Sequence, residues 1–320
     1  MEELINENSV LTIEDREKIK KKQDLKLQVP LHLMMAPSVI FGLIFSIIPL
    51  FGIIIAFQDY SPSAGIFKSQ FVDFYNFKKL FARADFSQAL FNTVYIALWK
   101  IVLTTVLSIT LALLLNEMVT KKGQKAVQTI VFLPYFLSWA LIGSVFVEIF
   151  SANGLANKIV LMFNPSAEKT DFLASNDYFR TIIVGTDLWK NLGYQAVVYL
   201  ASIATVDPSL YEAAKVDGAN KWQQCIFITI PGIMTMIVLT SVLNIGNIMN
   251  AGFEQILVMY NSLVYETGDI LDTMSYREAM VVGTDYSLST AISLFKSVIS
   301  CIFFVISYKL AHKINGYTIF

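Results

Sequence analysis

The chain has 320 residues, of which 55% are hydrophobic and only 15% are charged, and its formal net charge is −1. This composition excludes an ordinary soluble domain, because about a quarter of the residues in such a domain are charged. It predicts an integral membrane protein.

Residues 1–30 form a charged segment ahead of the first apolar run. A secretory signal peptide has an apolar core of its own, and this segment has none, so we expect it to remain as a tail. Its basic residues are Arg16, Lys18, Lys20, Lys21, Lys22 and Lys26. Basic residues next to a span favour the cytoplasmic side, so the tail is predicted to be cytoplasmic.

Six apolar runs follow, each with about 20 apolar residues, the length that crosses about 30 Å of hydrocarbon as a helix. They are centred on residues 31–57, 93–115, 127–149, 181–204, 226–248 and 289–311. The sequence therefore predicts an all-α membrane protein with a six-helix transmembrane domain at residues 31–315. Residues 316–320 are then a short cytoplasmic C-terminus.

The distribution of basic residues predicts the orientation of these spans. Lysines at the predicted inner ends are Lys121, Lys122, Lys125, Lys215, Lys221, Lys309 and Lys313. Residues 250–288, by contrast, carry Arg277 and six acidic residues. Six spans with this distribution place both termini in the cytoplasm, although the lysines of residues 58–88 depart from the rule, which long loops follow poorly.

The sequence contains no pattern for catalysis, metal binding or nucleotide binding. None of its 15 glycines is followed by lysine, so the phosphate loop G-x-x-x-x-G-K-[ST] is absent. Cys225 and Cys301 have no second Cys or His at ligand spacing. We therefore expect a chain that is not an enzyme and has no metal site.

Residues 207–231 are a polar, charged segment between two very apolar runs. Asp207 followed by Pro208 is typical of a helix start, and Gly218 can adopt the left-handed conformation that ends a helix. Asn220 offers a second cap, and Pro231 starts or kinks the fifth span. The segment is thus predicted to be a helix, a tight turn and a second helix.

The same segment contains E-A-A at residues 212–214, a glycine four residues later, and I-x-x-x-I-P ending at residue 231. It resembles the EAA loop of permease subunits of type I binding-protein-dependent ABC importers. In that family the loop is a coupling helix that docks in a groove of a cytosolic ATPase subunit. The residues that the resemblance assigns to ATPase coupling are Glu212, Ala213, Ala214, Asp217, Gly218 and Pro231.

The resemblance covers most of the chain after Leu31. Residues 186–214 look like the W-x-x-x-G span that precedes the EAA loop in carbohydrate importers. Residues 250–280 are similar to the branch that handles complex oligosaccharides and polysaccharide fragments. G-F-E-Q at residues 252–255 replaces the F-D and T-G-G-P pattern of simpler sugar permeases, which argues against a mono- or disaccharide substrate.

Membership of this family implies a multi-pass protein of the bacterial inner (cytoplasmic) membrane that works by alternating access. The implied partners are a second homologous permease subunit, which completes a heterodimer, two cytosolic ABC ATPase subunits, an extracytoplasmic solute-binding protein, an oligosaccharide and membrane lipid. The ATPase subunits would bind ATP and Mg²⁺. This chain is expected to bind no cofactor and no nucleic acid.

Polar residues within apolar spans are costly, so they are candidates for a substrate pathway. The candidates are Asp187, Trp189, Lys190, Asn191 and Tyr194 in the fourth span, and Thr240, Asn244 and Asn247 in the fifth. Asp187, Asn191 and Tyr194 recur on one helical face. Amides and carboxylates suit sugar hydroxyls, and aromatic rings suit the apolar faces of sugars.

Structural alternatives stay open for these residues. Asp187 and Lys190 stand three positions apart and could neutralise each other, and asparagines often join helices by hydrogen bonds. Lys100 and Lys296 also lie within predicted spans. We expect both lysines to extend toward the membrane surface, where their ammonium groups reach water.

Two other classes of function fit parts of the pattern. An ion-coupled secondary transporter would use Asp187 and Lys190 as coupling groups, but it leaves the EAA loop unexplained. An enzyme acting on lipid-linked sugars would need a carboxylate or metal cluster at one membrane face. The acidic residues between 254 and 285 lack histidine and recognisable ligand spacing.

Overall fold

The N-terminal part of the chain is a succession of helices. The computed structural model describes residues 13–283 and 285–315, and the chain divides into a unit that ends at Ile55 and a second that begins at Ala56. The first elements of the described chain are α2 (Ile13–Gly42), the π-helical turn η2 (Leu43–Ile47) and the 3₁₀ helix η3 (Ile48–Phe57). The run Gln28–Phe57 has a mean hydropathy of 2.8 and is almost entirely exposed within the chain. It contains the predicted first span.

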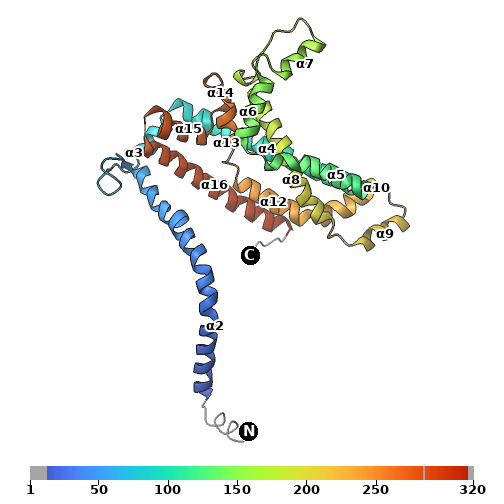
Figure 1. Cartoon of the computed structure of the whole chain (residues 1–320), viewed down its shortest axis with the longest axis horizontal. Helices are drawn as coiled ribbons and strands as arrows, with labels where there is room; N and C mark the ends of the chain where they lie inside the picture. The colour runs from blue at the N-terminus through green and yellow to red at the C-terminus, as the bar shows by residue number, and fades with distance from the viewer. Residues whose placement is uncertain (1–12, 284, 316–320) are drawn as a thin grey trace. The chain divides into compact units, whose positions relative to one another are not determined.

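The second unit is helical apart from one short hairpin within the described residues (Figure 1). Strands β1 (Gln58–Asp59) and β2 (Gln70–Phe71) pair antiparallel. The first helices are α3 (Tyr75–Phe81), α4 (Ala84–Asn116), α5 (Lys121–Phe132), η4 (Leu133–Phe136), α6 (Trp139–Phe150), α7 (Leu155–Phe163), η5 (Phe172–Ala174) and α8 (Phe179–Ile203). The later ones are α9 (Pro208–Val216), α10 (Lys221–Gln224), η6 (Cys225–Thr229), α11 (Ile230–Gly232), α12 (Met234–Gly246), α13 (Phe253–Met259), η7 (Ser262–Val264), α14 (Tyr265–Gly268), α15 (Leu271–Arg277), η8 (Glu278–Val282) and α16 (Tyr286–Asn315).

Several of these helices are long and apolar enough to cross a membrane. Within the described residues these runs are Gln28–Phe57, Ala84–Asn116, Trp139–Phe163 and Tyr286–Lys313, and the pair Lys221–Gly232 and Met234–Gly246, bent by 60°, is a fifth candidate. Helix α8 has 25 residues, but its polar residues keep it outside this group. The helices agree with a multi-span membrane protein, and the number of six spans stays a prediction.

The predicted third span, residues 127–149, is wrong as a single helix. The 3₁₀ helix Leu133–Phe136 and a non-helical step separate α5 from α6. Pro134 has no backbone N–H to continue a helix, and the Ser138 side chain caps the start of α6. The run long and apolar enough to cross a membrane here is Trp139–Phe163, which consists of α6 and α7 with a turn at residues 151–154 between them.

Helices α4 and α8 form the centre of the second unit and make its most extensive helix–helix contact. Gly193 lies on the side of α8 that meets the end of α5. A Cβ atom at Gly193 would overlap the backbone carbonyl of Val131 and lie 2.7 Å from the backbone nitrogen of Phe132. Only glycine permits this approach of the two backbones, which explains the last position of the W-x-x-x-G pattern.

Replacing Gly193 by alanine is expected to destabilise the fold by about 1–3 kcal/mol, because backbone atoms must move to admit the methyl group. Thermal unfolding of the purified protein would measure the loss. Gly185→Ala is the matched control on the same helix, since nothing lies within 4 Å of a Cβ at Gly185. Equal melting temperatures for the two variants would contradict the proposed backbone contact.

The segment 250–283, which follows α12, is folded rather than an open loop. It contains α13, α14 and α15. Its apolar side chains, including Ile256, Ile270, Leu271 and Met274, are fully buried and belong to the main apolar core. This segment therefore packs as a layer on the transmembrane helices.

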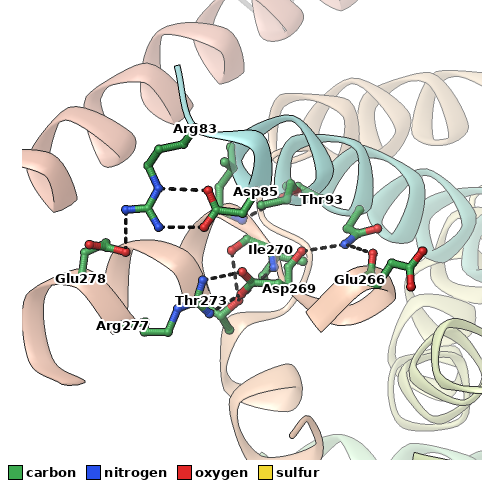
Figure 2. Close-up of polar contacts among 12 residues, drawn as sticks. Arg83, Asp85, Thr93, Glu266, Asp269, Ile270, Thr273, Arg277 and Glu278 are labelled. Atoms are coloured by element: carbon green, nitrogen blue, oxygen red, sulfur yellow. Dashed lines mark hydrogen bonds and ion pairs between the residues drawn. The ribbon is translucent and has the colours of Figure 1, made fainter. Parts of the chain in front are cut away.

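Polar contacts join this segment to the first turns of α4 (Figure 2). The Asn92 side-chain amide donates hydrogen bonds to the main-chain oxygens of Glu266 at 3.0 Å and Asp269 at 2.9 Å. The Thr93 hydroxyl oxygen accepts a hydrogen bond from the N–H of Leu271 at 3.0 Å. These bonds satisfy backbone groups that a buried turn would otherwise leave unpaired.

Two arginines complete the polar cluster in Figure 2. Arg277 donates two hydrogen bonds to the Asp269 carboxylate, at 3.0 and 2.6 Å. Burial opposes the charge on Arg277, but its bonds to Asp269 outweigh burial, so the pKa of Arg277 is raised. Arg83 bridges Asp85 and Glu278, at 2.7 and 2.9 Å. Arg83 thus joins the segment to the start of α4, and the Arg277–Asp269 pair joins residues within the segment.

Candidate functional site

The segment 207–231 forms the predicted helix, turn and second helix. Asp207 caps α9: its carboxylate accepts a hydrogen bond from the N–H of Ser209 at 2.9 Å, and that bond lowers the pKa of Asp207. Pro208 occupies the first helical position, where its missing N–H costs nothing.

Gly218 makes the turn between the two helices. Its φ of +80° is in the left-handed region, where a side chain adds strain. The N–H of Gly218 donates to the Lys215 carbonyl at 3.1 Å, and the N–H of Ala219 donates to the Ala214 carbonyl at 2.8 Å. This pair of bonds is the Schellman motif, which pairs carbonyls left open at a helix end.

The second helix begins immediately after the turn. Asn220 and Gln223 form a reciprocal capping box, with bonds of 2.8 and 2.9 Å between each side-chain oxygen and the other residue's N–H. The helical run ends at Gly232, one residue after Pro231, and the chain bends there by 60° before α12. The predicted kink near Pro231 is confirmed.

The surface of α9 is not covered by other parts of the described chain. Helix α9 has no buried residue, and Glu212 and Ala213 are both exposed. Apolar side chains are exposed beside them, with fractions of 51% for Leu210, 88% for Val216 and 72% for Trp222. An exposed apolar patch next to charged groups is typical of a protein interface.

A cavity of about 320 Å³ lies where α4, η4, α8 and the end of α12 meet residues 250–252. It brings together five of the predicted pathway residues, namely Asp187, Asn191, Tyr194, Asn244 and Asn247. Tyr135, which the sequence analysis did not single out, also lines it and stacks on Tyr194 with ring centres 4.2 Å apart. The cavity therefore combines amide, carboxylate and aromatic groups.

Three predicted pathway residues do not line this cavity. Trp189 packs edge-to-face on Phe146 and is half exposed on another side of α8. The Lys190 ammonium donates to the main-chain oxygens of Tyr135 and Leu137, both at 2.7 Å. Thr240 lines an adjoining cavity of about 310 Å³.

Thr240 also has bonds within the fold. Its hydroxyl lies 2.8 Å from the hydroxyl of the buried Tyr199 and donates to the Met236 carbonyl at 2.9 Å. This arrangement joins α12 to α8. The position of Thr240 thus fits helix packing as well as a cavity wall.

Lys100 is the partner of Asp187, a role that the sequence analysis missed. Its ammonium lies 3.2 Å from the Asp187 carboxylate and donates to the Ala251 carbonyl at 2.8 Å and the Gln255 side-chain oxygen at 2.5 Å. Lys100 is only 7% exposed, so the expectation that it extends to the membrane surface is wrong. The alternative of an Asp187–Lys190 pair is also wrong, because Lys190 bonds to carbonyls instead.

Gly252 lies directly beside this lysine. Its φ of +95° is left-handed, and a Cβ atom at Gly252 would lie 2.6 Å from the Lys100 ammonium nitrogen. The Gln255 amide nitrogen in turn donates to the Ile183 carbonyl and to the Thr186 hydroxyl, each at 2.8 Å. The G-F-E-Q stretch therefore links α13 to both α4 and α8.

A second cavity of about 630 Å³ adjoins the first, and Asn250 and Gly252 line both. Glu254, Asp272 and Lys296 are its charged lining residues. Lys296 donates to both carboxylate oxygens of Asp272, at 2.5 and 2.7 Å. The expectation that Lys296 extends to the membrane surface is therefore wrong as well.

Comparison with known proteins decides the family. Residues 105–316, more than half of the chain, match the model of the binding-protein-dependent transport system inner membrane component family. The chain belongs to this family. The permease is 38% identical over 279 residues to Protein LplB of Bacillus subtilis (strain 168), covering 87% of each chain. It is 37% identical over 284 residues to the polygalacturonan/rhamnogalacturonan transport system permease protein YteP of the same strain, covering 88% of each.

Solved structures agree with this assignment. The permease matches a chain of a bacterial ABC transporter involved in the import of the acidic polysaccharide alginate, with a TM-score of 0.84 and 32% identity, over 92% of the permease and 99% of that chain. A second structure of the alginate transporter, in complex with an alginate pentasaccharide-bound periplasmic protein, also gives a TM-score of 0.84. The family predicted from the EAA loop is confirmed: the chain is a membrane permease subunit of an ABC importer.

Proposed function

We propose that this permease moves an oligosaccharide into the cell by alternating access, driven by ATP hydrolysis in partner subunits. The proposal rests on which helices the exposed segment connects. Helices α8 and α12, which line the polar cavity, are the two helices joined by the exposed segment 207–231. A displacement of that segment is transmitted to both cavity walls through rigid, capped helices.

The residues of the segment have separate roles in this proposal. Glu212, Ala213 and Ala214 present the face of α9 that docks on an ATPase subunit. Asp217 and Gly218 end that helix and fix its angle, and Pro231 sets the bend into α12. The sequence has no phosphate loop of its own, so ATP and Mg²⁺ are bound by the partner ATPase subunits.

The cavity residues have the chemistry for an oligosaccharide. Asn191, Asn244 and Asn247 offer both donors and acceptors to sugar hydroxyls, and the stacked rings of Tyr135 and Tyr194 offer an apolar face. The relatives whose names specify a polysaccharide support this substrate class. Trp189, Lys190 and Thr240 lie outside the cavity, and we propose that they support its walls.

The remaining parts of the proposal concern placement and partners. We propose six spans with both termini in the cytoplasm of a bacterial cell, the charged residues 1–30 as a cytoplasmic tail, and residues 316–320 as a cytoplasmic end. A second homologous permease completes the pathway, and an extracytoplasmic binding protein delivers the oligosaccharide. The exposed apolar run Gln28–Phe57 is available to lipid or to the second permease.

The test is uptake of labelled oligosaccharides into proteoliposomes that contain the whole complex. We expect uptake and ATP hydrolysis to rise together when the loaded binding protein is added, and to stop when the ATPase subunits are replaced by a hydrolysis-deficient form. Uptake that continues with that form, driven by an ion gradient, would overturn the proposal in favour of a secondary transporter.

A further inference from the structure

The two adjoining cavities have an unusual balance of charged side chains. Their charged lining residues within the described chain are Lys100, Asp187, Glu254, Asp272 and Lys296. Two cations thus face three carboxylates. The other polar groups in the walls are amides and hydroxyls, which carry no charge.

Both cations are already neutralised by neighbours. Lys100 is paired with Asp187 and has two further acceptors, Ala251 and Gln255. Lys296 holds both oxygens of Asp272. An ammonium has three donor hydrogens, so Lys100 has none left for an incoming carboxylate, and the charge of Lys296 is already matched by Asp272.

Glu254 is the carboxylate of these walls without an ion pair in the described part of the chain. It is exposed at the wall of the larger cavity, and no ion pair to it is formed within the described residues. Lys190 lines neither cavity and attracts Glu254 only through space, because its ammonium bonds to main-chain carbonyls. The surface that this chain presents to a substrate is therefore neutral to acidic.

Two uncharged groups at the smaller cavity point to the same class of ligand. The hydroxyl oxygen of Thr104 and the side-chain oxygen of Gln195 are buried and have no hydrogen-bond partner within the described residues. Both residues line the cavity, and Thr104 is only 4% exposed. A sugar hydroxyl can donate to both oxygens, whereas an ionised carboxylate cannot donate to the Gln195 oxygen and can only accept from the Thr104 hydroxyl.

We infer that this permease carries neutral, hydroxyl-rich oligosaccharides and disfavours chains with a carboxylate on every sugar. The inference rests on the proposed transport of oligosaccharides. It separates this chain from relatives named for polygalacturonan and from the transporter of the acidic polysaccharide alginate. A uronate chain would bring several negative charges against Glu254 and find no free cation, and like charges in contact oppose binding.

The experiment compares uptake of a neutral pentasaccharide of arabinose with that of a pentagalacturonate by the reconstituted complex, with one binding protein throughout. We expect the wild-type complex to favour the neutral probe. Glu254→Lys should raise the ratio of pentagalacturonate to neutral uptake by about tenfold, because a repulsive contact becomes an attractive one. Glu266→Lys is the matched control, since it makes the same charge change in the same segment at an exposed residue outside both cavities.

The outcomes separate the two proposals. Preference for pentagalacturonate in the wild type, or equal ratios in Glu254→Lys and Glu266→Lys, would overturn the charge inference while leaving oligosaccharide import intact. Absence of ATP-dependent uptake of either probe and of other neutral oligosaccharides would instead remove the proposed function, and the inference with it.

Discussion

Replacing Gly218 by valine is expected to reduce oligosaccharide uptake by at least about tenfold while the subunit still folds and assembles. A left-handed conformation costs a residue with a side chain about 1–2 kcal/mol, and a β-branched side chain is among the least tolerant. Nothing lies within 4 Å of a Cβ at Gly218, so the cost comes from the backbone alone. The strained turn would change the angle at which α9 meets its partner.

Gly218→Asn is the matched variant, because asparagine adopts the left-handed conformation more readily than other residues with side chains. It should retain most of the uptake. Binding-protein-stimulated ATP hydrolysis, measured beside uptake, would show whether the two activities are uncoupled. Full uptake by Gly218→Val would mean that the turn geometry has no part in coupling.

Replacing Lys100 by methionine is expected to destabilise the permease by about 3–5 kcal/mol, the cost of breaking a buried ion pair by removing one partner. Methionine has a similar length but leaves the Asp187 carboxylate without its cation and the Ala251 carbonyl and Gln255 oxygen without a donor. The melting temperature of the purified complex should fall by at least about 5 °C.

A second substitution distinguishes the ion pair from simple loss of packing. The double variant Lys100→Met, Asp187→Asn has no uncompensated charge. It should recover more than half of the decrease in melting temperature caused by Lys100→Met alone. Lys296→Met is a useful comparison, because its partner Asp272 is more exposed and the pair is worth less. A double variant that is as unstable as Lys100→Met would show that packing alone explains the loss.

The 207–231 segment was predictable from sequence because its signals are local. Asp207, Pro208, Gly218 and Asn220 each act within a few residues of their own position, through caps and a left-handed turn. The shared position of Asp187, Asn191 and Tyr194 at one cavity was predictable for a related reason, since helical spacing places them on one side of α8.

Contacts between distant parts of the chain were not predictable in this way. Lys100 and Asp187 are separated by 87 positions, and nothing local to either residue indicates the other. The same holds for the bonds from Asn92 to Glu266 and Asp269. Hydropathy also gave the third span as a single helix, because it does not detect the helix break that Pro134 and Ser138 produce.

Gly252 has a consequence for how this permease can change over evolution. Any other residue there meets two penalties at once, a left-handed backbone and a Cβ atom 2.6 Å from the Lys100 ammonium. The second penalty disappears if Lys100 becomes shorter, but that change leaves Asp187 unpaired. Substitutions at the three positions are therefore coupled: Lys100 and Asp187 must lose their charges together, because either change alone leaves a buried charge unpaired, and even then the left-handed backbone still favours glycine at position 252.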